Sequence, residues 1–314
     1  HKPVNATEIN GRALLWDTIR EAIPFIITGS AIQLFQIIDQ STFIHVMGWI
    51  SKYSKSELLV QFAYFSANPN KITMILIAVA TSIGGVGIPL LTENYVKGDF
   101  RSAARLVQDN LSMLIFFILP ATIGAVLVAE PLYTVFYGKP DGLALGLFIF
   151  AMLQTIILSL YTVLAPMIQA LFQNRKAIIY FLYGVGVKLV LQVPLIYIFK
   201  AYGPLLATTV GLIIPILLMY QEIRKVTGLN PKNLFKRSLL SVILTVLMTI
   251  FVLVAELLIG LFLHPSGRIS SFVYIALIGG IGLAIYGGLA LKVRLMDRFI
   301  GSKAASLRRR FHIY

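Results

Sequence analysis

Long apolar runs alternate with short polar breaks along the whole chain. The apolar runs cover residues 23–50, 72–91, 111–129, 143–172, 177–199, 204–220, 239–263 and 272–293. Crossing about 30 Å of hydrocarbon takes about 20 residues of helix. Strands of a membrane barrel would instead be about 10 residues long, with alternating polarity. The pattern therefore predicts an all-α membrane protein with about eight transmembrane helices.

The breaks between the runs have the composition of turns. They are rich in Asn, Gly, Pro, Asp and Lys, as at residues 68–71, 97–99, 139–142, 173–176 and 264–267. Such clusters between periodic segments mark turns and loops. The chain begins with His1-Lys2-Pro3, and its first apolar run starts only near Ile23, with no signal peptide before it. We expect a part of a longer membrane protein.

Composition supports the membrane assignment and excludes several kinds of site. Hydrophobic residues make up 58% of the chain and charged residues 13%, whereas soluble domains have about 25% charged residues. The chain has no cysteine, so disulfides and thiolate metal sites are excluded. Its four histidines are too far apart in the sequence for a metal-ligand spacing. We expect no cofactor and no metal.

Positive charge is distributed asymmetrically between the breaks. With a cytoplasmic N-terminus, 20 of the 27 Lys and Arg residues fall in cytoplasmic segments, six fall outside, and Lys188 lies within a span. This asymmetry is the positive-inside pattern of cell-membrane proteins, and it places both termini in the cytoplasm. It favours contact of the basic tail, ending in residues 308–310, with anionic lipid headgroups. We expect no nucleic-acid partner.

Charged and amide side chains interrupt the apolar spans. Asp39 lies in the middle of the first span, beside a helical face that carries Gln33, Gln36 and Gln40, and Lys188 lies within the fifth span. A charge at the bilayer centre costs about 3 kcal/mol or more, so it usually faces a partner or a water-filled cavity. Two interpretations of each stay open. Asp39 contributes to transport or to helix packing, and Lys188 meets a substrate or pairs with a carboxylate.

Two further features could serve either transport or the structure of the bundle. Glu256 lies in the seventh span, where it either has a role in transport or sits near the outer interface. The second span contains Gly84, Gly85, Gly87 and Pro89, residues that kink helices and let them approach closely. Bent helices around polar residues suit an alternating-access carrier, although close helix packing explains glycines equally well. The glycines do not form a nucleotide loop, because they lack a preceding strand and the GxGxxG spacing.

Several short motifs, in order along nearly the whole chain, resemble the polysaccharide-transporter branch of the MOP (MATE-like) superfamily, above all the MurJ/YtgP-type lipid II flippases of Gram-positive bacteria. The motifs are Ile37-Ile38-Asp39, Ile88-Pro89-Leu90-Leu91-Thr92-Glu93 followed by Lys97-Gly98-Asp99, Tyr137-Gly138, the run from Gln169 to Lys176, and Tyr202-Gly203-Pro204. The resemblance implies a parent of fourteen helices, with two six-helix lobes and two extra C-terminal helices. Residues 1–228 would be the C-terminal lobe, with parent helices 7–12. Residues 229–314 would be the extra pair and a basic cytoplasmic tail, and a missing N-terminal lobe would be a partner.

The resemblance also implies a function and a set of candidate residues. The chain would belong to a flippase that moves an undecaprenyl-pyrophosphate-linked sugar, above all lipid II, across the cell membrane. Asp39 would couple or gate transport, and Lys71 and Lys188 would meet phosphate. The candidate cavity residues are Asp39, Lys71, Lys188, Gln36 and Glu93, and Arg20 and Glu21 would form a gate pair. Relatives carry an arginine near Lys71, and a lysine cannot offer the same bidentate fork.

Other functions stay open from the sequence. A flippase for another polysaccharide or teichoic-acid precursor would have the same architecture, and an ion-coupled drug exporter of the MATE type would share the fold. A glycosyl or phosphoglycosyl transferase is disfavoured, because no paired carboxylates, DxD motif or catalytic histidine lies at an interface. We therefore expect a transporter and no enzyme. A purely structural scaffold is disfavoured by the charges within the spans.

Overall fold

The computed structural model describes residues 11–263 and 265–297, except for the side chains of Ala13, Asp17 and Glu21. The described residues are helical and contain no β-strand. The helices are α1 (Gly11–Gly29), α2 (Ala31–Ile50), α3 (Lys55–Phe65), α4 (Ala67–Val96), α5 (Phe100–Leu127), α6 (Ala129–Tyr137), α7 (Gly142–Ala170), α8 (Asn174–Phe199), the 3-10 turn η1 (Lys200–Tyr202), α9 (Gly203–Thr227), α10 (Pro231–Gly260) and α11 (Arg268–Lys292).

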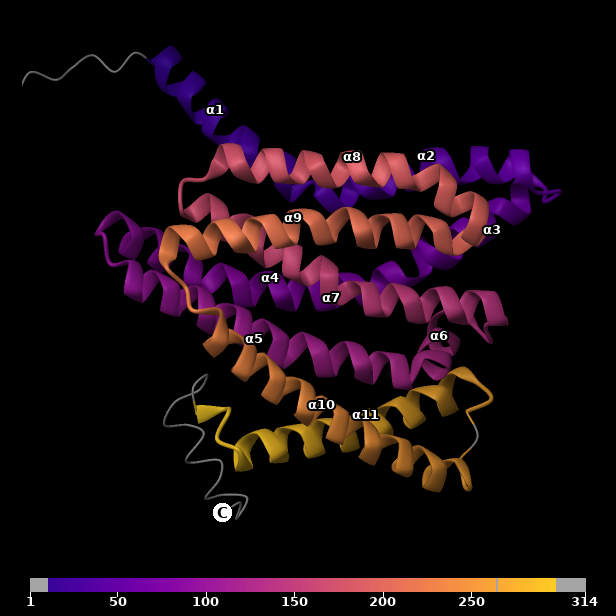
Figure 1. The fold of residues 1–314 in the computed structure, drawn as a ribbon. Helices are drawn as coiled ribbons and strands as arrows, with labels where there is room; N and C mark the ends of the chain where they lie inside the picture. The colour runs from indigo at the N-terminus through magenta and orange to yellow at the C-terminus, as the bar shows by residue number, and fades with distance from the viewer. Residues whose placement is uncertain (1–10, 264, 298–314) are drawn as a thin grey trace, which may run out of the picture.

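The long helices have the length and composition of membrane spans. Six helical segments of the described chain are long and apolar enough to cross a membrane, or seven if the bent pair of α1 and α2 counts as one span. One of the six, Asn174–Thr227, contains both α8 and α9, which lie side by side in opposite directions (Figure 1). The predicted all-α membrane fold is confirmed. The predicted number of eight helices is approximate.

The first predicted span is wrong in its shape and its start. Residues 23–50 were expected to form one helix, but α1 begins at Gly11 and meets α2 at Ser30 with a bend of 53°. Glycine–serine pairs are common sites of helix kinks, and Gly29 precedes Ser30 here. The bend makes α1 diverge from the bundle that α2 joins (Figure 1).

A short helix between the first two predicted spans was not predicted. Helix α3 begins with a capping box, in which Ser54 and Glu57 exchange side-chain and backbone hydrogen bonds. Such reciprocal caps satisfy backbone donors that a helix start otherwise leaves free. Helix α3 packs against both α4 and α7.

Polar residues in the breaks cap several of the long helices. Asp99 accepts a hydrogen bond from the Ser102 backbone N–H at the start of α5, and Asp141 accepts one from Ala144 at the start of α7. The Ser102 N–H holds the pKa of the Asp99 carboxyl below its usual range, as expected when the charged form accepts a hydrogen bond. Helix α9 ends at Thr227 and is followed by Gly228, whose φ of +70° suits glycine.

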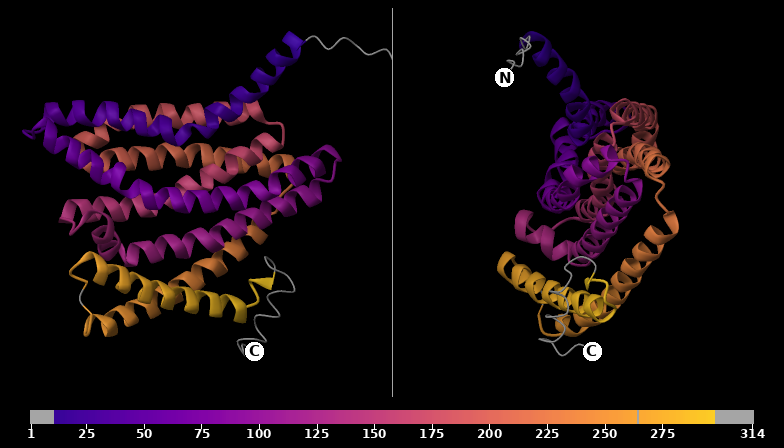
Figure 2. Two further views of the ribbon diagram at one scale, coloured as in Figure 1. Left: turned by 180° about the vertical axis from the view of Figure 1, so that it is seen from behind. Right: turned by 90° about the vertical axis from the view of Figure 1, so that its left-hand side faces the viewer.

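The helices pack in successive layers. Helices α2 and α8 lie at one edge, α9, α4 and α7 follow, and α5 separates them from α10 and α11 at the other edge (Figures 1 and 2). Helix α7 has buried residues along most of its length. The largest core cluster joins α2, α4, α5, α7, α8 and α9, and it includes Leu234 of α10.

Helices α10 and α11 pack on α5 and α6. Phe116 of α5 shares a buried cluster with Met248 of α10 and Tyr286 of α11. The Tyr286 hydroxyl donates a 2.8 Å hydrogen bond to the Phe116 carbonyl, and Arg237 of α10 forms an ion pair with Asp109 of α5. The predicted division at residues 228 and 229 falls between α9 and α10, and it stays a prediction.

The basic residues gather at one end of the bundle. This end holds the C-termini of α4, α9 and α11 and the N-termini of α5, α8 and α10 (Figure 1). Its described basic residues are Lys97, Arg101, Arg105, Arg175, Lys176, Arg224, Lys225, Lys232, Lys236, Arg237, Lys292 and Arg294. The opposite end carries Lys52, Lys55, Lys71, Lys139, Lys200 and Arg268. We refer to these two ends as the basic end and the opposite end.

Candidate functional site: a buried ion pair beside a polar cavity

A small polar cavity lies among α2, α4, α7 and α9. Its volume is about 60 Å³, which leaves room for a few water molecules but not for a sugar. Its polar lining consists of Gln36, Asp39, Ser66, Asn70, Thr73, Gln154 and Thr208, and its apolar lining includes Phe35 and Phe65. The cavity is therefore suited to hydrated polar chemistry in the interior of the helical bundle.

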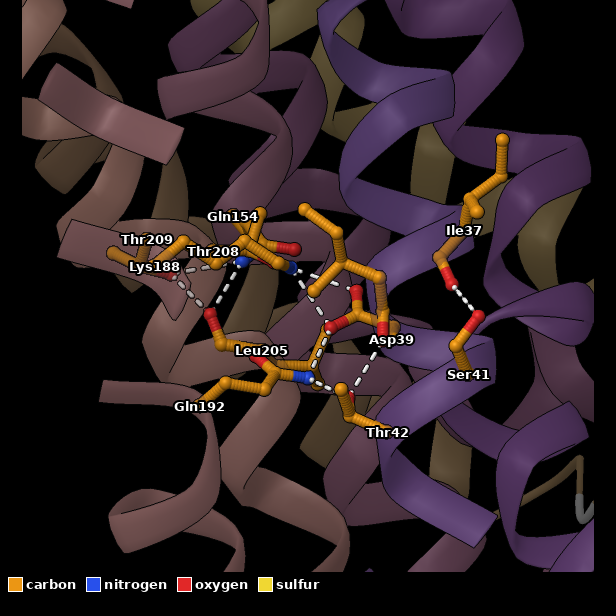
Figure 3. A network of polar contacts seen from close by, with 11 residues as sticks. Ile37, Asp39, Ser41, Thr42, Gln154, Lys188, Gln192, Leu205, Thr208 and Thr209 are labelled. Carbon is orange, nitrogen blue, oxygen red and sulfur yellow. Dashed lines mark hydrogen bonds and ion pairs between the residues drawn. The ribbon is translucent and has the colours of Figure 1, made fainter. Parts of the chain in front are cut away.

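Asp39 and Lys188 form an ion pair in the wall of this cavity. The Lys188 Nζ lies 2.8 Å from Asp39 Oδ1, and 149 residues separate the two in the sequence (Figure 3). Lys188 is fully buried and Asp39 is 7% exposed. Buried charges cost free energy unless they are paired and hydrogen-bonded. The pairing that the sequence left open for Lys188 is present in the structure.

Two neighbouring side chains, Gln192 and Thr208, complete the hydrogen bonds of the pair. Gln192 donates 2.8 Å and 2.9 Å hydrogen bonds from Nε2 to Asp39 Oδ1 and Thr42 Oγ1. Lys188 also donates to the Thr208 hydroxyl, which lies 3.5 Å from Asp39 Oδ2 (Figure 3). The network joins the middle of α2 and of α8 to the second turn of α9. A charged pair with these additional partners is held in one arrangement.

Close helix packing brings the lysine into this position. Helices α8 and α9 approach at Gly184, where an added Cβ would lie 2.3 Å from the Gly211 carbonyl oxygen. Lys188 follows Gly184 by one helical turn, so its side chain enters the same interface. Its Nζ also lies 4.8 Å from the centre of the Phe35 ring, an attractive cation–π geometry.

A second polar contact supports the cavity from α7. Gln154 donates from Nε2 to the Leu205 carbonyl at 2.7 Å and to the Thr209 hydroxyl at 2.8 Å. This amide fixes α7 against the start of α9 beside Thr208. Gln36, one of the predicted cavity residues, lines the same cavity from α2.

The other predicted residues lie away from this cavity. Lys71 is exposed on α4, with its Nζ 5.0 Å from the Tyr137 ring centre and 5.9 Å from that of Phe136. Glu93 is exposed near the other end of α4 and pairs with Lys97 at 2.5 Å. Since a helix rises 1.5 Å per residue, Glu93 lies about 30 Å along α4 from Thr73 in the cavity wall.

The predicted gate pair lies on α1. Arg20 is exposed there, on the far side of the bend from Asp39. The side chain of Glu21 lies outside the described residues, so their pairing stays a prediction. Glu256 is one turn before α10 ends at Gly260, a position that favours the interpretation of Glu256 as an interface residue.

Sequence reasoning missed Gln192, Thr208 and Gln154. The spacing could have indicated Gln192, because residues four apart share a helical face and Gln192 follows Lys188 by four. Thr208 and Gln154 are polar residues in apolar runs, a pattern common in helices that pack together. Among the described residues, no cluster of histidines and carboxylates could hold a metal ion.

Comparison with known proteins gives one strong likeness. No protein-family model matches the chain. The chain is 27% identical over 296 residues to the Lipid II flippase MurJ of Bacillus subtilis (strain 168). The matched region is 93% of this chain but 54% of that protein, so the chain spans about half the length of its relative. The likeness fits the C-terminal part of a MurJ-type flippase, and the chain is a multi-pass membrane protein similar to such flippases.

Proposed function

We propose that the chain is the C-terminal part of a flippase that moves an undecaprenyl-pyrophosphate-linked sugar, lipid II in the first place, across the cell membrane by alternating access. The observation that carries this proposal is the likeness to the MurJ flippase over nearly the whole chain. The likeness does not favour another polysaccharide precursor or a drug as the substrate. The protein acts as a transporter and not as an enzyme.

The exposed polar residues of α2 and α4 support a carrier with a central cavity. Helix α2 exposes Gln33, Gln40 and Ser41, and α4 exposes Thr81 and Ser82 in its middle. Amides and hydroxyls are unfavourable in contact with hydrocarbon. We propose that these faces line an aqueous path between this lobe and an N-terminal lobe. Asp39 and Lys188 then lie behind the wall of that path.

Depletion of the full-length protein tests the transport proposal. Lipid II is expected to accumulate in the inner leaflet and wall synthesis to stop, because the polar headgroup cannot cross the bilayer unaided. The measurement is the accessibility of lipid II to an external probe in intact cells. A matched strain that expresses the protein from a plasmid is the control. If lipid II stays equally accessible after depletion, the proposed function is wrong.

We further propose that the basic end faces the cytoplasm and contacts anionic lipid headgroups. Single cysteines in a full-length protein with no other cysteine test this orientation. A cysteine at Lys232, at the basic end, is expected to react with a membrane-impermeant thiol reagent only after cells are opened. A cysteine at Lys55, at the opposite end, is expected to react in intact cells. The reverse pattern would exclude the proposed orientation.

A further inference from the structure

A strained residue lies in the turn between α7 and α8, at the basic end. Phe172 has a φ of +56°, in the left-handed region that favours glycine. Its N–H donates to the Gln169 carbonyl at 2.9 Å, and the next N–H along the chain donates to the Ile168 carbonyl at 3.1 Å. Helix α4 ends in the same pair of hydrogen bonds, with Gly98 at the matching position and a φ of +75°. The chain therefore has glycine at one such helix end and accepts the conformational cost of phenylalanine at the other.

Packing does not explain the phenylalanine at this position. Phe172 is 60% exposed, so its ring does not fill a space in the core. The ring contacts Tyr95 of α4 at 6.2 Å between ring centres, and Tyr95 contacts Phe100 of α5 at 5.7 Å. Phe100 is 48% exposed. Residues with a strained backbone are frequent at ligand contacts. We refer to the rings of Tyr95, Phe100 and Phe172 as the aromatic cluster.

The aromatic cluster lies where one face of α4 reaches the basic end. Ser82, Pro89 and Val96 follow one another at intervals of seven residues, so they share a face of α4, and all three are exposed. Ser82 belongs to the face that we propose to line the aqueous path. That face ends at Val96, next to Tyr95. With the basic end in the cytoplasm, the aromatic cluster lies at the cytoplasmic mouth of the proposed path.

The charges around the aromatic cluster favour an anionic ligand. Arg101 directly follows one ring in the sequence, Arg175 lies three residues after another, and both arginines are exposed. The carboxylates of Glu93 and Asp99 nearby already pair with Lys97 and cap α5, respectively. A cytoplasmic loop of the N-terminal lobe would fit these arginines poorly, because such loops are themselves rich in Lys and Arg.

We propose that the aromatic cluster is a loading site for the headgroup of the lipid-linked substrate, where a sugar ring stacks on Phe172 and the diphosphate meets Arg101 and Arg175. This inference rests on the proposed transport function and adds a first contact at the cytoplasmic mouth. The C–H bonds on the face of a sugar suit the negative face of an aromatic ring. Arginine binds phosphate oxygens in a bidentate geometry. Glycine at position 172 would relieve the strain but would lose this contact.

Transport of lipid II by the full-length protein in liposomes tests the loading site. Phe172→Leu keeps an apolar side chain at the strained position and removes the ring. It is expected to raise the lipid II concentration at half-maximal transport severalfold, with an unchanged maximal rate, whereas Phe172→Tyr is expected to behave like wild type. Phe235→Leu makes the same change at a phenylalanine of α10 that is 66% exposed and outside the aromatic cluster, and it is expected to have no effect. Equal behaviour of the two leucine variants would overturn the proposal. So would a lower maximal rate at an unchanged half-maximal concentration, because it would assign the ring to a conformational step.

A glycine variant separates the ring from the backbone that carries it. Phe172→Gly removes both the ring and the strain, so it is expected to raise the thermal midpoint in detergent while it weakens loading as much as Phe172→Leu does. A lower thermal midpoint would show that the ring serves packing, and would overturn the proposal. Wild-type protein that moves no lipid II would instead overturn the transport function on which the loading site rests.

Discussion

Replacing Asp39 with asparagine is expected to destabilise the protein by about 3–5 kcal/mol and to abolish transport, because it leaves the fully buried Lys188 ammonium without its counter-charge. The hydrogen bonds from Gln192 and Thr208 cannot replace that charge. Thermal unfolding of the full-length protein in detergent measures the stability, and lipid II accessibility measures the transport. Lys188→Met is expected to have a similar cost, since it leaves the Asp39 carboxylate unpaired.

The double variant Asp39→Asn with Lys188→Met distinguishes a functional pair from a packing device. It removes both charges at similar volume, and such replacements are often neutral or stabilising. Recovered stability with lost transport would assign the charges to the transport cycle. Recovered stability with recovered transport would show that the pair serves packing alone. Wild-type stability in either single variant would contradict the buried pair itself.

Gly184→Val is expected to have the second large effect, because the new Cβ would meet the Gly211 carbonyl oxygen at 2.3 Å. Backbone cannot rotate aside as a side chain can, so α8 and α9 must separate. The cost is expected to reach or exceed the about 1–3 kcal/mol of ordinary overpacking. The measurement is the yield and thermal midpoint of the detergent-extracted protein.

A matched control for this prediction lies two residues further along α8. Gly186 has no atom within 4 Å of an added Cβ, so Gly186→Val makes the same chemical change without the clash. It is expected to stay near wild type in yield and thermal midpoint. Equal loss in both variants would assign the effect to valine in the helix and not to the contact between α8 and α9.

The sequence predicted the spans well because membrane helices are set by local composition. Continuous apolar runs and turn-type breaks located α4, α5 and α7 to α11, although several helices begin well before their apolar runs, as α5 does at Phe100. The kink at Ser30 was missed because apolar residues continue on both sides of it. The short helix α3 was missed because its 11 residues are too few to cross a bilayer.

The candidate site could be predicted only in part, because it is built from distant segments. Asp39 and Lys188 stood out individually, since charges within apolar runs are rare. Their ion pair joins residues 149 positions apart. It depends on how α8 packs on α2, which no local sequence pattern predicts. Lys71 and Glu93 were candidates from the family resemblance, yet the length of α4 separates them. Helix geometry alone was enough to exclude a shared site for these two residues.

The contacts of α5 with the last two helices have a mechanical consequence. The ion pair between Arg237 and Asp109, and the hydrogen bond from Tyr286 to Phe116, fix α10 and α11 to the same helix at two levels. If the C-terminal lobe rotates against the N-terminal lobe during alternating access, α10 and α11 would therefore move with it as one rigid body. The lipid that surrounds them would have to rearrange at every turnover, so bilayer thickness and fluidity would act directly on the rate of the cycle.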